Sequence, residues 1–289
     1  MKVAILGTGK MGAAMARRLH QQGFDVRLWN RTRSRAEQLR IGQVFDTPAR
    51  AVDGADLAIS MLTDSSAVRL AYLGENGAAQ ATGAPIYVDS STVDPGTHEQ
   101  LARALARRGA SFLEAPVVGS VPAVESGKLL ILVGGDEITL ERIRPVLAVL
   151  GEVRHVGPLG HAARLKLLAN SMLGITSAAA AELYNAGLRT GLDRQRIWEI
   201  LTRFVPYLDA RRAGYLDGKV EPAMFRLADL VKDLRLARDL YGQVATNTPL
   251  TETTRELFER AAGEHGEQDI AAIAELWREP SAVQKTGRR

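Results

Sequence analysis

An abrupt change of pattern at Gly157-Pro158 divides this sequence into two parts. Before it, short apolar runs alternate with helical patterns, whereas only helical patterns follow it. Alternating strands and helices predict a parallel sheet covered by helices on both faces, and strands that are apolar almost throughout agree with burial on both faces. The pattern therefore predicts an α/β domain over residues 1–159 and an all-helical domain over residues 160–289.

The expected elements can be placed by residue range. Strands are expected at residues 3–6, 26–29, 57–61, 86–89, 111–114 and 129–133, and helices at residues 11–22, 33–39, 96–108 and 136–150. A long helix at 161–189 is apolar nearly all round and precedes helices near 193–203, 223–244, 250–262 and 269–277. Ala178–Ala181 lets another helix approach closely, so we predict a homodimer or higher homo-oligomer through the helical domain.

Composition excludes several classes of protein. Among 289 residues, 37 Lys and Arg oppose 33 Asp and Glu, a net charge of +4 with no basic arm, so no nucleic-acid partner is expected. Cysteine is absent, and the five histidines lack metal-ligand spacing, so neither a thiol nucleophile nor a metal site is expected. No uncharged apolar stretch reaches about 18 residues, and no secretory signal is recognisable. We expect no membrane contact and a cytoplasmic location.

The first chemical motif directly follows the first strand. Gly7-Thr8-Gly9-Lys10-Met11-Gly12 has the spacing G-x-G-x-x-G and opens a helix within a β-α-β unit, which is the context that makes this spacing informative. Gly7 permits a tight turn, Gly9 lets the backbone approach a pyrophosphate, and Gly12 lets the helix pack on the sheet. Free N–H groups at the helix N-terminus then face the phosphates. The motif predicts a Rossmann-type dinucleotide-binding domain rather than an ordinary glycine-rich turn.

The second strand ends in a basic segment, Asn30-Arg31-Thr32-Arg33-Ser34-Arg35. An NAD site usually has Asp or Glu here to bind the ribose 2′-OH. A carboxylate would repel a 2′-phosphate, whereas arginine binds it through a charge-assisted fork. We predict NADP(H) in preference to NAD(H), with Arg31, beside Asn30 and Thr32, as the phosphate ligand. Arg33 and Arg35 can instead lie on the exposed face of the next helix.

The third and fourth strands end in Met61-Leu62-Thr63 and Asp89-Ser90-Ser91-Thr92. Ligands bind beyond the carboxyl ends of strands in open α/β sheets. These segments are therefore expected to line the nicotinamide half of the site. Asp89, Ser91 or Thr92 can equally cap the helix that follows, and the residues alone leave both roles open.

Four sequence blocks occur in a recognisable order across nearly the whole chain. They are Gly7–Gly12 with Asn30–Thr32, Asp89–Pro95 with Phe112–Ser120, Gly160–Asn170, and Phe225–Leu234. In these blocks the chain resembles the β-hydroxyacid dehydrogenase family, which contains 3-hydroxyisobutyrate dehydrogenase and glyoxylate/succinic semialdehyde reductase. The resemblance implies a dinucleotide-binding domain and a helical domain joined by a long helix. It also implies reduction of a small carboxylate-bearing aldehyde or keto acid, such as glyoxylate or succinic semialdehyde, by NADPH.

The resemblance implies that Lys166 is the catalytic acid and base. The residue type suits that chemistry, because a lysine ammonium can stabilise a developing alkoxide and donate a proton to it. Asn170 lies four residues later on the same helix face, and is implied to orient the ammonium or bind substrate. Without the resemblance, Lys166 can equally be a solvated helix residue, although Leu165, Leu167 and Leu168 crowd it in the sequence.

Substrate contacts are implied for Ser91, Thr92 and the loop Val118-Gly119-Ser120. Backbone N–H groups in a glycine-containing turn suit a carboxylate. Many relatives have Ser-Gly-Gly in this loop, and the Gly-Ser ending here resembles the glyoxylate/succinic semialdehyde reductase branch more. Ala162 stands where a second glycine is common. Val118 therefore replaces a hydroxyl with an apolar wall and leaves the choice of substrate open.

Lys232 matches the family's lysine that closes over nicotinamide and substrate. Its alternative role is a simple charge pair with Asp233 on an amphipathic helix. Two other functions also stay open. An imine reductase-like enzyme is disfavoured because such relatives generally lack a lysine at the position of Lys166. A non-catalytic dinucleotide-binding sensor would be expected to lose Lys166 or Asn170, and both are present.

Overall fold

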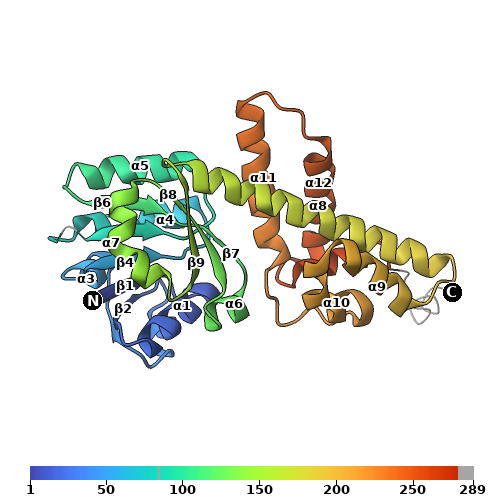
Figure 1. Cartoon of the computed structure of the whole chain (residues 1–289), viewed down its shortest axis with the longest axis horizontal. Coiled ribbons are helices and arrows are strands. Elements are labelled where there is room, and N and C mark those ends of the chain that lie inside the picture. The colour runs from blue at the N-terminus through green and yellow to red at the C-terminus, as the bar shows by residue number, and fades with distance from the viewer. Residues whose placement is uncertain (84, 279–289) are drawn as a thin grey trace, which may run out of the picture. The chain divides into compact units, whose positions relative to one another are not determined.

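The computed structural model describes residues 1–83 and 85–278 (Figure 1). The chain divides into two compact units between Leu168 and Ala169. The first unit contains, in chain order, β1 (Lys2–Leu6), α1 (Lys10–Gln21), β2 (Asp25–Trp29), α2 (Arg33–Glu37), β3 (Gln43–Val44), α3 (Pro48–Val52), β4 (Leu57–Ser60), α4 (Ser65–Leu73), η1 (Ala78–Gln80), β5 (Ile86–Asp89), α5 (Pro95–Ala106), β6 (Ser111–Glu114), β7 (Val117–Val118), α6 (Val121–Glu125), β8 (Leu129–Gly134), α7 (Glu137–Leu147) and β9 (Gly151–Gly157). The long helix α8 (His161–Arg189) begins in this unit and continues into the second.

The first unit is built on a mixed, nine-stranded sheet. Its order is β3-β2-β1-β4-β5-β6-β8-β7, with β9 paired to β8. The strands from β3 to β6 are parallel, as expected. β8 runs antiparallel to β6 and β7, so the prediction of a wholly parallel sheet is wrong at this edge. The sequence pattern did not predict β3, β7 or β9, because β3 and β7 have two residues each and the edge strand β9 is largely polar.

Both faces of the sheet are buried beneath helices, as its central strand β1 shows. Val3 and Ile5 belong to a core that includes residues of α1 and α7. Ala4 and Leu6 belong to a separate core that includes residues of α3, α4 and α5. All four side chains are fully buried. The unbroken apolar run in β1 therefore reflects two packing faces, as expected for a strand in the middle of a doubly covered sheet.

The second unit is helical. Beyond α8 it contains α9 (Arg194–Phe204), η2 (Pro206–Arg211), α10 (Arg212–Asp217), α11 (Leu227–Gln243), α12 (Pro249–His265) and η3 (Ile270–Leu276). Its core surrounds the buried Trp198, whose ring centroid lies 6.2 Å from that of Tyr184 and 5.1 Å from that of Tyr215. Three residues of the alanine run, Ala178, Ala180 and Ala181, are buried in this core. The close approach predicted for this run thus occurs inside the chain, and an interface between subunits needs another face of α8.

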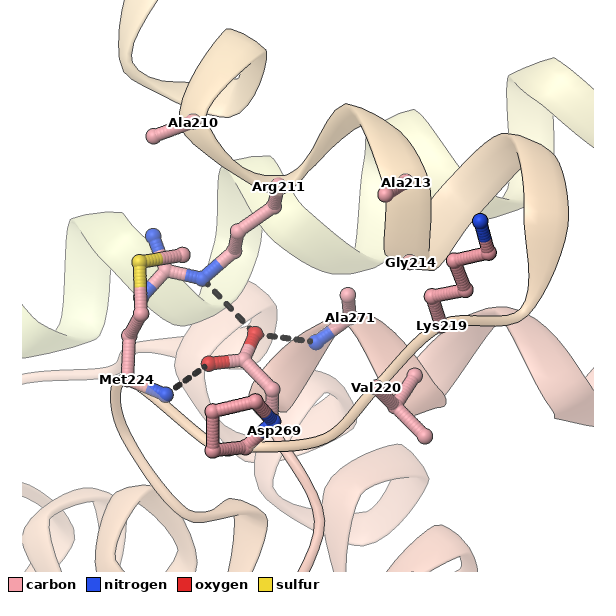
Figure 2. Close-up of a pocket in the computed structure, with 10 residues that line it drawn as sticks. Ala210, Arg211, Ala213, Gly214, Lys219, Val220, Met224, Asp269 and Ala271 are labelled. Atoms are coloured by element: carbon pink, nitrogen blue, oxygen red, sulfur yellow. Dashed lines mark hydrogen bonds and ion pairs between the residues drawn. The ribbon is translucent and has the colours of Figure 1, made fainter.

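A buried carboxylate ties together the loops of the helical unit (Figure 2). Asp269 Oδ1 accepts hydrogen bonds from Arg211 Nε at 2.9 Å and from the N–H of Ala271 at 3.1 Å. Asp269 Oδ2 accepts from the N–H groups of Met224, at 2.9 Å, and Phe225, at 3.1 Å. The adjoining cavity of about 60 Å³ has room for only a few water molecules. Asp269 therefore stabilises the unit rather than forming a ligand site.

Two further findings concern residues 1–83 and 85–278 only. No helix in these ranges is long and apolar enough to cross a membrane. They also contain no group of three or more His, Asp and Glu side chains arranged to hold a metal ion. The cytoplasmic location stays a prediction, which neither finding tests.

Candidate functional site

The order of the strands locates a candidate ligand site. From β1 the chain passes to β2 and β3 on one side and then returns to β4 on the other side of β1. Ligands of open α/β sheets bind at such a reversal, outside the carboxyl ends of the strands. The segments that follow β1, β2, β4 and β5 contain the predicted cofactor residues, and the topology brings these segments to one edge of the sheet.

The conformation and packing of the loop between β1 and α1 show which of its three glycines are needed within the protein. Gly7 has a φ of +100°, and a Cβ there would lie 2.4 Å from the carbonyl oxygen of Met61. A Cβ on Gly12 would lie 2.0 Å from the carbonyl oxygen of Gly7, whereas a Cβ on Gly9 would meet nothing within 4 Å. The first and third glycines are needed for packing within the protein. Gly9 borders open space at the start of α1, where a phosphate can approach the backbone.

Thr8 and Asn30 connect this loop to the end of β2. The N–H of Thr8 donates to Asn30 Oδ1 at 2.9 Å, and Asn30 Nδ2 donates to the carbonyl oxygen of Thr32 at 2.9 Å. Thr8 is only 5% exposed, yet its hydroxyl has no hydrogen-bond partner among the described residues. Because buried hydroxyls are normally hydrogen-bonded, this one fits a polar group of a bound dinucleotide. Lys10, which is exposed, and Met11, which is half-buried, open α1 beside it.

Two of the arginines after β2, Arg31 and Arg33, differ in their surroundings. Arg33 Nε lies 2.7 Å from Glu37 Oε1, and Arg33 Nη1 lies 2.5 Å from Asp46 Oδ1. Arg31 is exposed and makes no hydrogen bond or ion pair with any residue that the structure describes. Arg33 is therefore held by carboxylates of its own chain, and Arg31 keeps all its donors for a ligand.

The ends of β4 and β5 are joined by one serine. The Ser91 hydroxyl donates to Asp89 Oδ1 at 2.7 Å and accepts from the N–H of Leu62 at 2.8 Å. The cap of α5 is Asp94, whose Oδ1 accepts from the N–H of Thr97 at 2.8 Å. The alternative role of Asp89, Ser91 or Thr92 as a helix cap is therefore wrong. The other predicted residues at this edge are Met61 and Thr92, both half-buried, and Thr63, which is exposed.

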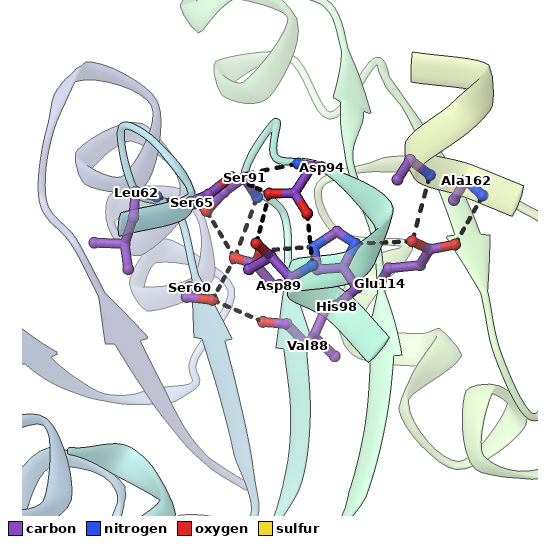
Figure 3. A network of polar contacts seen from close by, with 12 residues as sticks. Ser60, Leu62, Ser65, Val88, Asp89, Ser91, Asp94, His98, Glu114 and Ala162 are labelled. Atoms are coloured by element: carbon purple, nitrogen blue, oxygen red, sulfur yellow. Dashed lines mark hydrogen bonds and ion pairs between the residues drawn. The ribbon is translucent and has the colours of Figure 1, made fainter. Parts of the chain in front are cut away.

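A histidine buried between two carboxylates lies directly beneath this edge (Figure 3). His98 Nε2 is 2.8 Å from Asp89 Oδ2, and His98 Nδ1 is 2.8 Å from Glu114 Oε2. All three side chains are fully buried. Burial opposes the charged form of His98, but the hydrogen bonds to Asp89 and Glu114 outweigh it and raise the pKa of His98 to about 9. Sequence reasoning gave His98 and Glu114 no role, and a lone histidine in a helix is a weak signal.

The loop predicted to bind the substrate carboxylate follows β7. Gly119 has a φ of +132°, and a Cβ there would lie 2.8 Å from Leu129 Cδ2, so a side chain does not fit. Ser120 is half-buried at the N-cap position of α6, but its side chain makes no capping hydrogen bond to that helix. Val118 is half-buried beside it. The loop thus offers a hydroxyl next to an apolar surface.

Lys166 lies in the second turn of α8. It is half-buried, and Leu167 beside it is fully buried. Leu165 is 42% exposed and Leu168 is 58% exposed, so the expectation that three leucines crowd Lys166 is wrong for two of them. Asn170 follows one turn later and is 4% exposed.

In the helical unit, Asp233 joins two of the predicted site residues. Asn170 Nδ2 donates to Asp233 Oδ2 at 2.5 Å, and Lys232 Nζ lies 2.6 Å from Asp233 Oδ1. The Asp233 side chain is 2% exposed and that of Lys232 is 24% exposed. The Lys232–Asp233 ion pair is therefore not merely a solvated charge pair, because Asp233 is buried and also holds the side-chain amide of Asn170. The sequence predicted no role for Asp233 beyond a charge pair, although its place directly after Lys232 was an available signal.

Two family models match the chain. The one described as the NAD binding domain of 6-phosphogluconate dehydrogenase matches residues 2–158, and the one described as NAD-binding of NADP-dependent 3-hydroxyisobutyrate dehydrogenase matches residues 160–277. The chain belongs to the β-hydroxyacid dehydrogenase family. The predicted resemblance and the fold class are thereby confirmed. The chain is an NAD(P)-binding oxidoreductase of this family, whose members are dehydrogenases and reductases that act on CH–OH groups.

Individual relatives agree with this assignment. Glyoxylate/succinic semialdehyde reductase 2, chloroplastic, of Arabidopsis thaliana is 32% identical over 284 residues, which cover 95% of this chain and 79% of the relative. The structure of Mycobacterium tuberculosis 3-hydroxyisobutyrate dehydrogenase with L-serine has a TM-score of 0.86 at 28% identity, covering 96% of this chain and 99% of that one. Psf3 in complex with NADP+ and 2-OPP has a TM-score of 0.87 at 29% identity, covering 96% and 100%. The chain also spans about half the length of the cytokine-like nuclear factor N-PAC proteins that it matches.

Proposed function

We propose that this protein uses NADPH to reduce a small aldehyde or keto acid that carries a carboxylate, such as glyoxylate or succinic semialdehyde. The observation that carries the proposal is the half-buried Lys166, with the buried Asn170 one helical turn away. The similarity to a glyoxylate/succinic semialdehyde reductase supports the substrate class. In this proposal residues 1–159 bind the dinucleotide, and residues 160–289 bind substrate and mediate dimerisation.

The residues at the edge of the sheet fit a dinucleotide. The open space at Gly9 and the unpaired buried hydroxyl of Thr8 suit the pyrophosphate. Arg31, whose donors are unused within the described chain, suits a 2′-phosphate and favours NADP(H) over NAD(H). The family match by an NADP-dependent dehydrogenase and the similarity to an NADP+ complex support the same preference. The full set of proposed cofactor residues is Gly7, Thr8, Gly9, Lys10, Met11, Gly12, Asn30, Arg31, Thr32, Met61, Leu62, Thr63, Thr92 and Lys232.

The proposed chemistry divides one reduction between cofactor and protein. When held by these residues, a reduced nicotinamide would supply the hydride that the carbonyl carbon needs. The Lys166 ammonium stabilises the negative charge that develops on the carbonyl oxygen and donates a proton to it, and its amine removes that proton in the reverse direction. Asn170, held by Asp233, orients Lys166 or the substrate.

The substrate carboxylate is assigned to Ser91, Thr92 and the loop Val118-Gly119-Ser120, with Lys232 as a further ligand. Ser120 supplies a hydroxyl that is not used to cap α6. Ser91 already donates its proton to Asp89, so it can offer substrate only a lone pair. Thr92 and Ser120 are therefore the stronger candidates for donating a hydrogen bond to a carboxylate.

Initial rates of nicotinamide oxidation test this proposal. The panel crosses NADPH and NADH with glyoxylate, succinic semialdehyde, methylmalonate semialdehyde and a cyclic imine. Turnover of one or more of the acids with NADPH is expected. Turnover of the imine alone assigns the protein to the imine reductase-like alternative, and NADPH binding without any turnover favours the sensor.

The role of Lys166 is tested separately by Lys166→Ala. General acid–base groups contribute about 100- to 10,000-fold to rate, so kcat should fall by that factor while the Kd for NADPH changes less than about twofold. Glu152→Gln, which removes an exposed charge from the edge strand β9, is the control and should leave both unchanged. An unaltered kcat in Lys166→Ala would remove lysine from the mechanism.

A further inference from the structure

The buried Asp89–His98–Glu114 network indicates which form of the His98 imidazole is present. A neutral imidazole has one N–H and one lone pair. It would donate to one carboxylate and place its lone pair against the other. The doubly protonated ring donates to both carboxylates, at 2.8 Å each. The geometry therefore fits an imidazolium between two carboxylates.

The remaining contacts of both carboxylates are also with donors. Asp89 Oδ1 accepts from the hydroxyl of Ser60 at 2.6 Å and from that of Ser91 at 2.7 Å. Glu114 accepts from the N–H of Ala162 at 2.8 Å and, more weakly, from that of Ala163 at 3.4 Å. Each carboxylate is thus bonded on both sides, which fixes its position within the core.

Each end of this hydrogen-bond network contacts a segment that contains proposed site residues. Through Ser91, Asp89 reaches the N–H of Leu62 and so joins the ends of β4 and β5. Glu114 binds the N-terminal N–H groups of α8, where a carboxylate also stabilises the helix dipole. Lys166 lies four residues after Ala162, which is one helical turn, about 6 Å along the axis.

The packing around Glu114 leaves its carboxylate little freedom. A Cβ on Gly134 of β8 would lie 2.2 Å from Glu114 Oε1. The ring of Phe112 packs against His98, with centroids 5.8 Å apart. The carboxylate is therefore confined by the sheet on one side and by α8 on the other.

We infer that His98 is a positioning residue that holds the first turns of α8, and with them Lys166, in register with the ends of β4 and β5. It acts through Asp89 and Glu114 and does not itself contact the reacting atoms. The inference rests on the role proposed for Lys166 in the reaction, but the placement of Lys166 can be measured without any substrate.

The first test follows the lysines directly. The chain has seven lysines, so reductive ¹³C-methylation gives a simple NMR spectrum in which Lys166→Arg identifies the Lys166 signal. His98→Gln and Glu114→Gln should shift that signal. Tyr87→Phe is the matched control, because it removes another buried hydrogen bond from β5, to the carbonyl oxygen of Ala78 at 2.9 Å, outside the network. It should leave the Lys166 signal in place.

The second test separates positioning from general stability. In His98→Gln, kcat should fall about 10- to 100-fold, because small misplacements of reacting groups have effects of this size. The Kd for NADPH should stay within about twofold, and Tyr87→Phe should change neither. Loss of NADPH affinity in proportion to kcat would mean that the domain has merely loosened.

Three outcomes overturn the inference. One is an unmoved Lys166 signal in folded His98→Gln or Glu114→Gln. Another is a shift of equal size in Tyr87→Phe. The third needs no variant at all: ¹⁵N spectra of the imidazoles in the unaltered protein at pH 7.5 must show both nitrogens of His98 protonated, and a neutral ring removes the premise. If the protein reduces none of the acids, the proposed function fails while the NMR tests still decide the placement of Lys166.

Discussion

At the scale of single residues, neighbouring arginines distinguish the two dinucleotides. Arg33 is engaged by Glu37 and Asp46, whereas Arg31 has no partner among the described residues. Hydrogen bonds to charged groups contribute about 1.5–3 kcal/mol, which corresponds to roughly 10- to 100-fold in affinity. Arg31→Ala should therefore raise the KM for NADPH by that factor and the KM for NADH by less than about twofold, as measured by initial rates with both cofactors.

Arg33→Ala is the control for this prediction. It removes a guanidinium of the same charge two residues further along the chain. The ion pairs of Arg33 are exposed and contribute little to stability. Both KM values should stay within about twofold. Equal losses with NADPH and NADH in Arg31→Ala would contradict the 2′-phosphate assignment, and discrimination only in Arg33→Ala would transfer it to Arg33.

At the scale of elements, the network that joins α5 to β5 and β6 should make stability depend on pH. The pKa of His98 rises from 6.5 to about 9 in the folded protein, because its bonds to Asp89 and Glu114 outweigh the effect of burial. A raised pKa contributes stability that is complete below about pH 6.5 and is lost as the pH rises to about 9. Tyr72, which is bonded to Ser60 beside Asp89, stays neutral in this window, because burial raises its pKa well above the ordinary value.

Urea unfolding at pH 6.5, 7.5 and 9 measures this contribution. The free energy of unfolding should fall with rising pH, with a slope of at most about 1.4 kcal/mol per pH unit from this one proton. His98→Gln should be less stable at pH 6.5 and should have a flatter profile. Parallel profiles for the two proteins would show that His98 is not charged in the folded state.

A second prediction for elements concerns Asp269, which joins the segment before α11 to η3 and to the end of η2. Its side chain is 6% exposed and that of Arg211 is 10% exposed. Removing one partner of a buried ion pair costs about 3–5 kcal/mol, so Asp269→Ala should destabilise the helical unit by roughly that amount. Urea unfolding followed by tryptophan fluorescence, to which the buried Trp198 of this unit contributes, measures the loss. Glu152→Ala, at the exposed pair with Arg154, should change stability by less than about 1 kcal/mol.

The sequence predicted these elements to very different degrees. The glycine loop and α8 were predictable, because local spacing and an uninterrupted apolar pattern determine them. The antiparallel β8 was not, because its direction depends on pairing with strands distant in the sequence. The same applies to the site: Arg31 could be inferred from its neighbours, whereas the His98 network joins residues from α5, β5, β6 and α8 that only the fold assembles.

At the scale of the whole molecule, the proposed homodimer requires an exposed apolar surface that can form the interface between subunits. The alanine run of α8 is covered within the chain, but other apolar residues of the helical unit remain open. On α8, Met172 is 59% exposed and Leu183 is 54% exposed; on α9, Ile200 is 63% exposed and Phe204 is 83% exposed. Exposed apolar surface of this extent on neighbouring helices is typical of interfaces between subunits, and it supports the helical unit as the site of association.

Substituting this surface tests the proposed assembly. A charge buried in an apolar interface is strongly unfavourable, so the double variant Met172→Glu, Leu183→Glu should be monomeric where the unaltered protein is a dimer or larger. Light scattering coupled to size exclusion measures the mass, and thermal unfolding shows whether the subunit itself is intact. Ile138→Glu, at a side chain of α7 that is 77% exposed in the first unit, is the control and should keep the oligomer. A monomeric unaltered protein would contradict the proposed homodimer, because the apolar face of α8 would then be stable in water. A double variant that still associates would mean that the interface does not include this face of α8.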